Sequence, residues 1–435
     1  MQRRDFFRWM AGAGLCCTSA ALLRGANADQ TGSGLPTASG VYGGPLWVTL
    51  EAHGGWDTTW VCDPHANLNR SYNESGIGSA GALRYPNVGT VIPGFFQDFA
   101  DRLMVVNGLD NSTVVHRTGQ YNTWTGHLDE THPVLAALVA GTHAPQLPLA
   151  FVGEGVRNMT EGLVAQTRVD NSDVLQELSF PNVANPSAAE DMQLEYHAEP
   201  AAEMIASWRK ERLDKMAQSQ NLPRIRHAMD NLGMVRTGEN ELALLQSFLP
   251  ETLNADPVRR RIEIIVAAYK AGLGVSANLR VNAPGDNFDT HNNNDVRQRA
   301  QMEYFLGVAR FLWNEMDRQL GDSGGAAENL VAMMGSDFAR QSNRVDGYNA
   351  NNGKDHWSVT SMMLMGSGIP GGRVVGGTNE RQNALRVDPN TLEISDNGIT
   401  LGPKHVHKAL RKLAGVSAEI DARFPLDCEE LPLFS

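Results

Sequence analysis

Short apolar runs alternate with helical patterns along most of this chain, and this alternation constrains the fold more than any other feature. The runs with the character of buried strands are 46–50, 103–109, 149–152, 275–281, 330–335 and 361–366. Helical patterns are found at 95–102, 134–140 and 302–320. The sequence therefore predicts an α/β fold with a doubly wound, mostly parallel sheet flanked by helices, and sites at the carboxyl ends of the strands.

The strand signal disappears between about residues 185 and 273. Apolar residues there, such as Met204, Trp208, Ile262 and Tyr269, have helical spacing. We interpret this segment as a helical insertion in a single domain spanning residues 45–435. Residues 29–44 are rich in small residues and predict a flexible lead-in before the first strand.

The first 28 residues have the pattern of an export signal. Arg3 and Arg4 precede an apolar stretch at 9–23, and Ala26-Asn27-Ala28 is a small-x-small cleavage site. The adjacent arginines indicate a twin-arginine (Tat) signal, so we expect the Tat translocase as a partner and a periplasmic or secreted protein. The alternative is an N-terminal amphipathic helix.

The charge balance excludes one class of partner. The 435 residues contain 37 Lys and Arg against 49 Asp and Glu, and without residues 1–28 the counts are 33 against 48, a net charge of -15. No basic surplus is available for nucleic acid. Outside the signal no apolar run reaches the ~18 residues of a membrane span. Cys62 and Cys428 are the cysteines of the mature chain and are compatible with one disulfide in an oxidising compartment.

Polar residues that could bind a metal ion or take part in catalysis follow the first two predicted strands. Asp57 ends the motif Gly54-Gly55-Trp56-Asp57, where a carboxylate either holds a cation or caps the next segment. The segment 110–127 is dense in hydroxyl, amide and imidazole groups. It has the groups for a nucleophile, a metal ligand and oxyanion donors, or for a hydrogen-bonded turn network.

Asp and His also occur further along the chain, next to other predicted strands. Asp289 and His291 are two residues apart, and in extended backbone their side chains share a face and can converge on one ion. Asp337 and Arg340 follow another apolar run, and His356 precedes the next. Six of the twelve histidines lie between positions 53 and 143. Taken together, these side chains predict a metal site.

These motifs in this order resemble domain-of-unknown-function family 1501, in the alkaline phosphatase and sulfatase-like superfamily. The carriers of the resemblance are the Tat signal, Gly54-Gly55-Trp56-Asp57, the segment 116–126, Phe288-Asp289-Thr290-His291, Ser336-Asp337-Phe338-Ala339-Arg340 and Asp355-His356. The resemblance implies an alkaline phosphatase-like fold that holds one or two divalent metals (zinc, calcium or magnesium) beside a nucleophile that attacks a phosphate or sulfate ester.

Site residues follow from the resemblance by position. The implied metal-site residues are Asp57, Asp289, His291, Asp337 and His356. Thr118 is the implied nucleophile, with Thr58 second, and His116 lies beside it. Arg340 or Arg117 is the implied ligand of the anionic group, since a guanidinium binds such groups bidentately.

Two positions depart from the superfamily pattern. Phe338 stands where the superfamily has a His after Asp337, and Val115 stands where many relatives have a Ser. The recurrent Asp and His residues and the resemblance lead us to expect an exported, metal-dependent hydrolase acting on a small-molecule or polymer ester of phosphate or sulfate. Phe338 and Val115 motivate the alternative, a catalytically inactive cell-envelope binding or scaffold protein that retains the fold.

Overall fold

The computed structural model describes residues 42–169, 180, 182–184, 194–220, 222, 242, 244–245, 247–341 and 347–435. The expected signal at 1–28, most of the lead-in and part of the expected insertion lie outside these residues. The chain divides into two units. The larger comprises Pro45–Val139, Glu154–Met159 and Ala277–Ser435, and the smaller comprises Met1–Gly44, Ala140–Gly153 and Thr160–Ser276.

An eight-stranded sheet is the centre of the fold, with strand order β12-β4-β11-β8-β1-β7-β5-β6. Its strands are β1 (Leu46–Ala52), β4 (Leu103–Asp110), β5 (Leu149–Glu154), β6 (Gln166–Thr167), β7 (Gly274–Arg280), β8 (Leu330–Ser336), β11 (Val359–Gly366) and β12 (Arg373–Gly376). Each of the six apolar runs in the sequence is one of these strands, as predicted. Two small antiparallel pairs accompany the sheet: β2 (Ile77–Ala80) with β3 (Leu83–Pro86), and β9 (Ala339–Arg340) with β10 (His356–Trp357).

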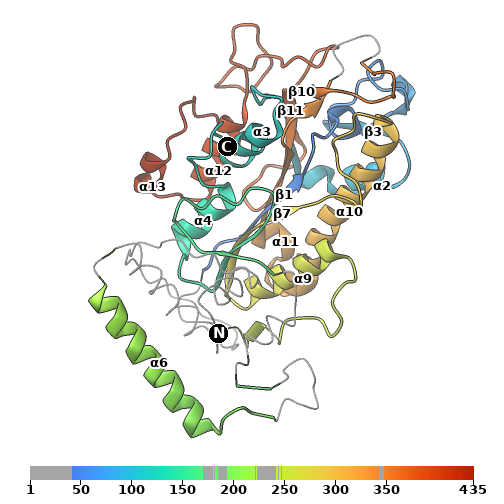
Figure 1. Cartoon of the computed structure of the whole chain (residues 1–435). Coiled ribbons are helices and arrows are strands. Elements are labelled where there is room, and N and C mark those ends of the chain that lie inside the picture. Colours follow the sequence, from blue (N-terminus) through green and yellow to red (C-terminus); the bar gives the residue numbers. More distant parts are fainter. Residues whose placement is uncertain are drawn as a thin grey trace. The chain divides into compact units, whose positions relative to one another are not determined.

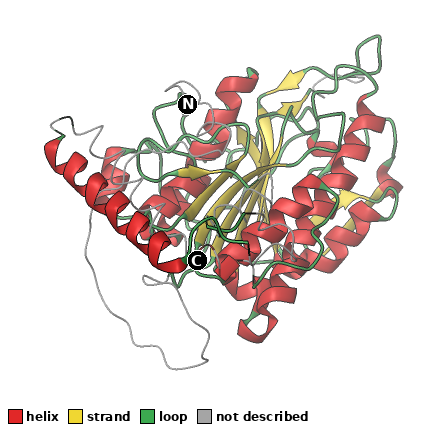
Figure 2. Ribbon diagram, turned by 60° about the horizontal axis from the view of Figure 1, so that its bottom comes forward, coloured by secondary structure: helices red, strands yellow, loops and turns green. Residues whose placement is uncertain are grey.

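The sheet is mostly parallel. β1 pairs with β8, β12 with β4 and β5 with β6 in parallel, whereas β11 runs antiparallel to both β4 and β8. Figure 2 shows the twist that the strands accumulate across the sheet. The burial pattern explains the apolar runs, because all seven residues of β1 and all seven of β8 are buried.

Helices cover both faces of the sheet in the larger unit, which confirms the doubly wound architecture. In Figure 1, α3 and α12 lie on one side of the strands, and α2 and α10 lie on the other. Across both units, the helices of the described residues are α2 (Val91–Phe99), α3 (His116–Thr125), α4 (Leu135–His143), α6 (Glu199–Ser219), α9 (Pro257–Lys270), α10 (Asn294–Leu320), α11 (Gly325–Asn329), α12 (Pro403–Leu413) and α13 (Ala418–Arg423). Single 3₁₀ turns occur at η1 (Thr58–Trp60), η2 (Glu74–Gly76), η3 (Ala100–Arg102) and η5 (Gly321–Ser323).

The predicted long helix is the main support of one sheet face. α10 buries Met302, Phe305 and Trp313 at helical spacing. The ring of Phe99 on α2 packs against Trp313 with centroids 5.6 Å apart. Aromatic packing therefore fixes α10, and the loop that leads into it, against the rest of the larger unit.

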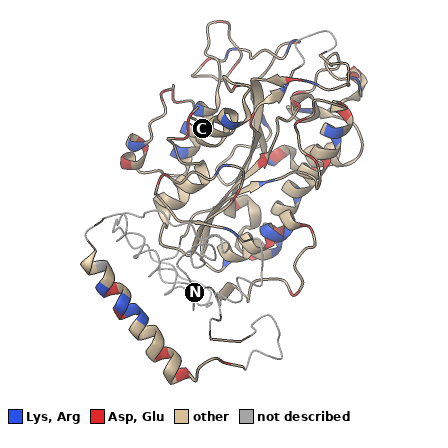
Figure 3. Ribbon diagram, viewed as in Figure 1, with Lys and Arg blue, Asp and Glu red and all other residues tan. Residues whose placement is uncertain are grey.

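In the smaller unit, α6 and α9 lie within the range expected to be a helical insertion. Asp256 caps α9 by accepting hydrogen bonds from Val258 N (2.9 Å) and Arg259 N (3.1 Å). Along α6, charges of both signs alternate (Figure 3), and Lys210 pairs with Asp214 at 3.1 Å. Among the described helices, none combines the length and apolarity that crossing a membrane requires.

Cys62 and Cys428 are both free thiols, so the structure does not contain the disulfide that the sequence left possible. The Cys62 thiol is buried beside β4 and donates a hydrogen bond to Asn107 Oδ1 at 3.4 Å. Cys428 is half-buried near α12, where its carbonyl accepts a hydrogen bond from Lys408 Nζ at 2.5 Å. Each thiol therefore has its own local environment, and the structure does not join them.

A buried histidine makes stability depend on pH. His407 on α12 is fully buried, and its Nε2–H donates to the Thr123 carbonyl of α3 at 2.8 Å. Burial lowers its pKa to about 3. Since the unfolded chain takes up this proton near pH 6.5, we expect this contribution to stability to fall by about 1.4 kcal/mol per pH unit as the pH drops from about 6 toward 3.

Urea denaturation across this pH range tests the expectation with the variant His407→Gln. The glutamine amide can donate to the same carbonyl and does not titrate, so the variant should lose stability less steeply on acidification. The variant His197→Gln, at an exposed position, is the control and should keep the wild-type slope. Equal slopes for wild type and His407→Gln would contradict the assignment.

Candidate functional site

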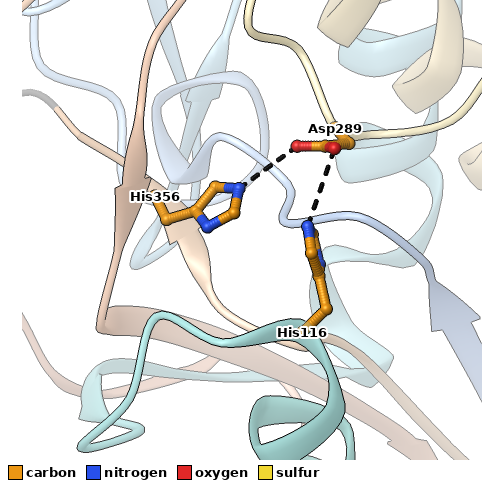
Figure 4. A group of neighbouring side chains, drawn as sticks. All are labelled: His116, Asp289 and His356. Carbon is orange, nitrogen blue, oxygen red and sulfur yellow. Dashed lines mark hydrogen bonds and ion pairs between the residues drawn. The ribbon is translucent and has the colours of Figure 1, made fainter.

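Loops that follow the sheet strands bring four polar side chains together. His116 begins α3 after β4, Asp289 and His291 lie between β7 and α10, and His356 begins β10. Asp289 Oδ1 lies 3.1 Å from His291 Nε2 and 3.2 Å from His356 Nε2. Asp289 Oδ2 lies 3.6 Å from His116 Nε2. Figure 4 shows the carboxylate between the rings of His116 and His356. We call His116, Asp289, His291 and His356 the histidine cluster.

Each imidazole of the histidine cluster has its other nitrogen next to an acceptor. His116 Nδ1 lies 2.5 Å from Asp337 Oδ2, and His291 Nδ1 lies 3.3 Å from Asp355 Oδ1. His356 Nδ1 lies 2.8 Å from the Val114 carbonyl. Because carboxylates and carbonyls only accept, each Nδ1 carries the proton, and each neutral ring turns the lone pair of Nε2 toward Asp289.

This arrangement fits a cation. Lone pairs that face a carboxylate repel it unless a proton or a metal ion lies between them. Among the described residues, His116, Asp289 and His356 have ligand atoms that all lie within 4.8 Å of one another. A bound imidazole whose second nitrogen donates to a carboxylate or carbonyl is the usual supporting arrangement of protein metal sites. The donor set therefore suits a divalent cation.

Without a metal, protons fill the same role. Burial lowers the pKa of His116, but hydrogen bonds to Asp289 and Asp337 outweigh it and raise the pKa to about 9. Burial raises the pKa of Asp289, whereas its bonds to His116, His356 and Arg340 hold that pKa well below the usual range. Asp289 is thus a carboxylate at neutral pH.

Two glycines of the motif after β1 allow the site loops to approach each other. Gly54 has φ +115°, and a Cβ there would lie 2.5 Å from the backbone nitrogen of Asp289. Gly55 has φ +88°, and a Cβ there would lie 2.6 Å from the Phe338 ring. Only glycine combines these conformations with this closeness.

Phe338 forms an apolar wall of the site. Its ring centroid lies 4.6 Å from that of His116 and 4.3 Å from that of His356. The phenyl ring therefore restricts the orientation of both imidazoles at the position where the superfamily pattern has a histidine.

Asp337 is fully buried and orients His116 of the histidine cluster. Its Oδ2 accepts a hydrogen bond from His116 Nδ1 at 2.5 Å, and its Oδ1 accepts hydrogen bonds from Gly54 N and Ser336 Oγ, both at 3.1 Å. Asp337 was expected in the metal-site set. The structure places it behind His116, with both oxygens engaged by the protein.

Arg340 holds Asp289 in place, which corrects its expected role as a ligand of the substrate anion. Its side chain is fully buried, and its Nη2 donates to Asp289 Oδ1 at 2.7 Å. Its other donors bind the carbonyls of Gly54, Gly55 and Lys354. The guanidinium is therefore committed to the protein.

Arg117 also differs from its expected role. It is exposed on α3, and its Nη2 donates to both carboxylate oxygens of Glu130 at 2.9 and 2.8 Å. Its Nε donates to the Tyr121 hydroxyl at 2.8 Å. The Nε and Nη2 donors of Arg117, which would bind an anionic group in bidentate fashion, are therefore bonded to Tyr121 and Glu130.

Asp57 does not join the histidine cluster, which corrects the expectation that it is a metal-site residue. It is fully buried, and its Oδ2 accepts hydrogen bonds from Lys354 Nζ at 2.7 Å and Asn294 Nδ2 at 2.9 Å. Its Oδ1 accepts from Thr59 N and so caps η1. The capping interpretation left open by the sequence is the one that the structure shows.

The expected nucleophiles also lie apart from the histidine cluster. Thr118 is two residues after His116 on α3, and side chains two apart on a helix do not face each other. Thr58 is buried, and its hydroxyl accepts a hydrogen bond from Gln382 Nε2 at 2.9 Å.

Sequence reasoning assigned no role to two residues that organise this site, although it noted Asp355 in the motif Asp355-His356. Lys354 is buried and pairs with Asp57, although lysine is seldom found inside proteins. Asp355 orients His291. The only sequence signal was their position directly before His356 in Gly353-Lys354-Asp355-His356-Trp357.

The chain was compared with curated proteins, with family models and with solved structures. No curated protein matches the sequence. A family model described as "Protein of unknown function (DUF1501)" matches residues 158–396. Among solved structures, the chain is similar to Ps i-CgsB at 12% identity, covering 90% of this chain and 75% of that one with TM-score 0.39. A 2-O GAG sulfatase is similar at 10% identity, 86% and 71% coverage and TM-score 0.33. An alkaline phosphatase from the Antarctic bacterium TAB5 is similar at 9% identity, 86% and 99% coverage and TM-score 0.29.

Proposed function

The chain belongs to the DUF1501 family of proteins of unknown function, and from that premise we propose that it is a metal-dependent hydrolase of phosphate or sulfate esters. The observation that carries the proposal is the geometry of the histidine cluster. Three imidazoles have their Nδ1 atoms tied to acceptors, and their Nε2 atoms all face the carboxylate of Asp289.

The donor set favours zinc among the divalent ions expected from the sequence. Calcium and magnesium prefer oxygen ligands, whereas zinc takes imidazole nitrogen together with carboxylate oxygen. His116 and His356 supply two nitrogens within reach of the Asp289 carboxylate, and His291 Nε2 lies 3.1 Å from that carboxylate. We therefore propose zinc as the ion of the histidine cluster.

The residues around the histidine cluster orient the side chains that would bind the ion. A divalent ion bound there would neutralise charge on the ester's anionic group and polarise an ester oxygen. Asp337 and Asp355 keep the rings of His116 and His291 oriented, and Arg340 holds the carboxylate. Phe338 lowers water access to one side of the rings.

Hydrolysis assays after metal removal and replacement test the proposal. The mature protein is treated with a chelator, dialysed and assayed with 4-nitrophenyl phosphate and 4-nitrophenyl sulfate, with and without one equivalent of zinc. We expect at least one ester to be hydrolysed only when zinc is restored. Equal rates in chelated and restored samples would rule out metal-dependent hydrolysis.

A second function is favoured by the position of the hydroxyl groups. Thr118 is two positions from His116 on α3 and so does not share its face, and the Thr58 hydroxyl is bonded to Gln382. A cell-envelope protein that binds a metal without turnover fits this observation. It predicts one bound ion per chain and no hydrolysis of either ester in the same assay.

We also propose that the protein is exported through the Tat translocase. This part of the proposal rests on the sequence of residues 1–28. The mature protein is then periplasmic or secreted. Replacing Arg3 and Arg4 together with lysine should leave the precursor in the cytoplasm, as seen by cell fractionation. Normal export of that variant would show that another route is used.

A further inference from the structure

His53 lies beside the histidine cluster and belongs to the loop directly after β1. Its ring centroid is 6.1 Å from that of His116. Its backbone is held on both sides: its N–H donates to Asn282 Oδ1 at 3.2 Å, and its carbonyl accepts from Phe288 N at 3.0 Å. The ring is therefore presented to the site from a fixed backbone.

A buried glutamine fixes the protonation of this ring. Arg157 Nε donates to Gln120 Oε1 at 2.9 Å. Because a guanidinium only donates, the carbonyl end of the Gln120 amide must face Arg157. The amide nitrogen then faces His53, and Gln120 Nε2 donates to His53 Nδ1 at 3.0 Å.

The consequence is a tautomer opposite to that of the other site histidines. An Nδ1 that accepts a hydrogen bond has no proton, so the neutral His53 ring carries its proton on Nε2. In the histidine cluster the neutral rings carry the proton on Nδ1. When the histidine cluster holds an ion, the Nε2 lone pairs of its rings face that ion, and His53 instead offers a donor.

The donor is available to a ligand. Among the described residues, none makes a hydrogen bond to His53 Nε2, and the ring is partly exposed. Gln120 follows His116 by four residues on α3, so both side chains lie on the same face of the helix. The hydrogen-bonded series Arg157–Gln120–His53 therefore lies along the edge of the histidine cluster.

We propose that His53 binds the anionic group of the substrate by donating its Nε2–H to one of the tetrahedral group's oxygens, with Gln120 and Arg157 as positioning residues. This role rests on the proposed function. The carboxylates of Asp289 and Asp337 repel such an anion, and a donor at the edge of the site offsets part of that repulsion.

The tautomer is tested first, on metal-free full-length protein, by nitrogen-15 NMR of the histidine rings. We expect the wild-type His53 signals to show a protonated Nε2 and an unprotonated Nδ1. Gln120→Leu removes the fixed donor, so the ring should become a mixture of both tautomers. A wild-type ring protonated on Nδ1 would overturn the proposal, whatever the protein hydrolyses.

The binding role is tested with inorganic phosphate and zinc-loaded protein by calorimetry. His53→Leu should weaken phosphate binding about tenfold or more with zinc content unchanged, because a hydrogen bond to a charged group is lost. His53→Gln, whose amide reaches the position of Nε2, should restore most of the affinity. The variant His197→Leu, at an exposed position, is the control and should bind as wild type.

Three results of this experiment would overturn the proposal: no phosphate binding by the wild type, equal affinity for wild type and His53→Leu, or loss of zinc in His53→Leu, which would make His53 a ligand. Failure of the proposed function is recognised separately. In that case no ester is hydrolysed, although the tautomer and the phosphate affinities come out as expected.

Discussion

Replacing Asp289 with alanine is expected to weaken zinc binding at least ~100-fold and to abolish any zinc-dependent ester hydrolysis. Its carboxylate is the one group that faces all three Nε2 atoms of the histidine cluster. Losing even a supporting residue of a metal site typically costs 10–100-fold in affinity, so losing a central ligand should cost more. Competition with a chromogenic chelator measures the zinc affinity.

Asp286→Ala is the matched control for this variant. Asp286 lies three residues earlier in the same loop and pairs with Arg297 on the surface. Its zinc affinity should stay within about twofold of wild type. His291→Ala, at a more exposed position of the histidine cluster, repeats the test with little risk to folding. Wild-type zinc affinity in both Asp289→Ala and His291→Ala would show that the cluster does not bind the ion.

Replacing Lys354 with methionine is expected to lower the free energy of unfolding by about 3–5 kcal/mol. The side chains of Lys354 and Asp57 are both fully buried, with Nζ and Oδ2 2.7 Å apart. Removing the lysine leaves a buried carboxylate without its counter-charge. Urea denaturation of the metal-free protein measures the loss without any contribution from bound ions.

Two further variants separate the buried charge from general packing. In the double variant Lys354→Met, Asp57→Asn, no unpaired carboxylate remains, and much of the stability should return. Lys412→Met breaks an exposed pair with Glu430 and should leave the free energy of unfolding close to that of the wild type. A Lys354→Met loss as small as that of Lys412→Met would contradict the importance of the buried pair.

The architecture could be predicted from the sequence because its signals are local. Runs such as 46–50 and 330–335 are apolar throughout since they lie inside a sheet covered on both faces. The helix at 302–320 shows its buried stripe at helical spacing. The antiparallel direction of β11 leaves no such mark, because strand direction depends on connections and pairing and not on composition.

Sequence reasoning named some residues of the candidate site, and its errors at the buried residues Asp57 and Arg340 share one physical cause. Asp289 and His291 were named from their spacing in one loop, and His356 from its place beside an apolar run. The resemblance added their metal-site role, and the structure brings the three side chains together. Asp57 and Arg340 have equally suitable chemistry, but each is saturated by a distant partner. Lys354 lies 297 residues after Asp57, and Gly55 lies 285 residues before Arg340. Such pairings arise only when the chain folds.

The most direct test of a metal site at the histidine cluster is the metal content of protein exported from the cell and purified without chelators. Elemental analysis should find at least one divalent ion per chain. Anomalous diffraction from crystals of that protein should place the ion among His116, Asp289, His291 and His356. Less than a stoichiometric ion, or an ion bound elsewhere with the histidine cluster empty, would contradict a metal-dependent function.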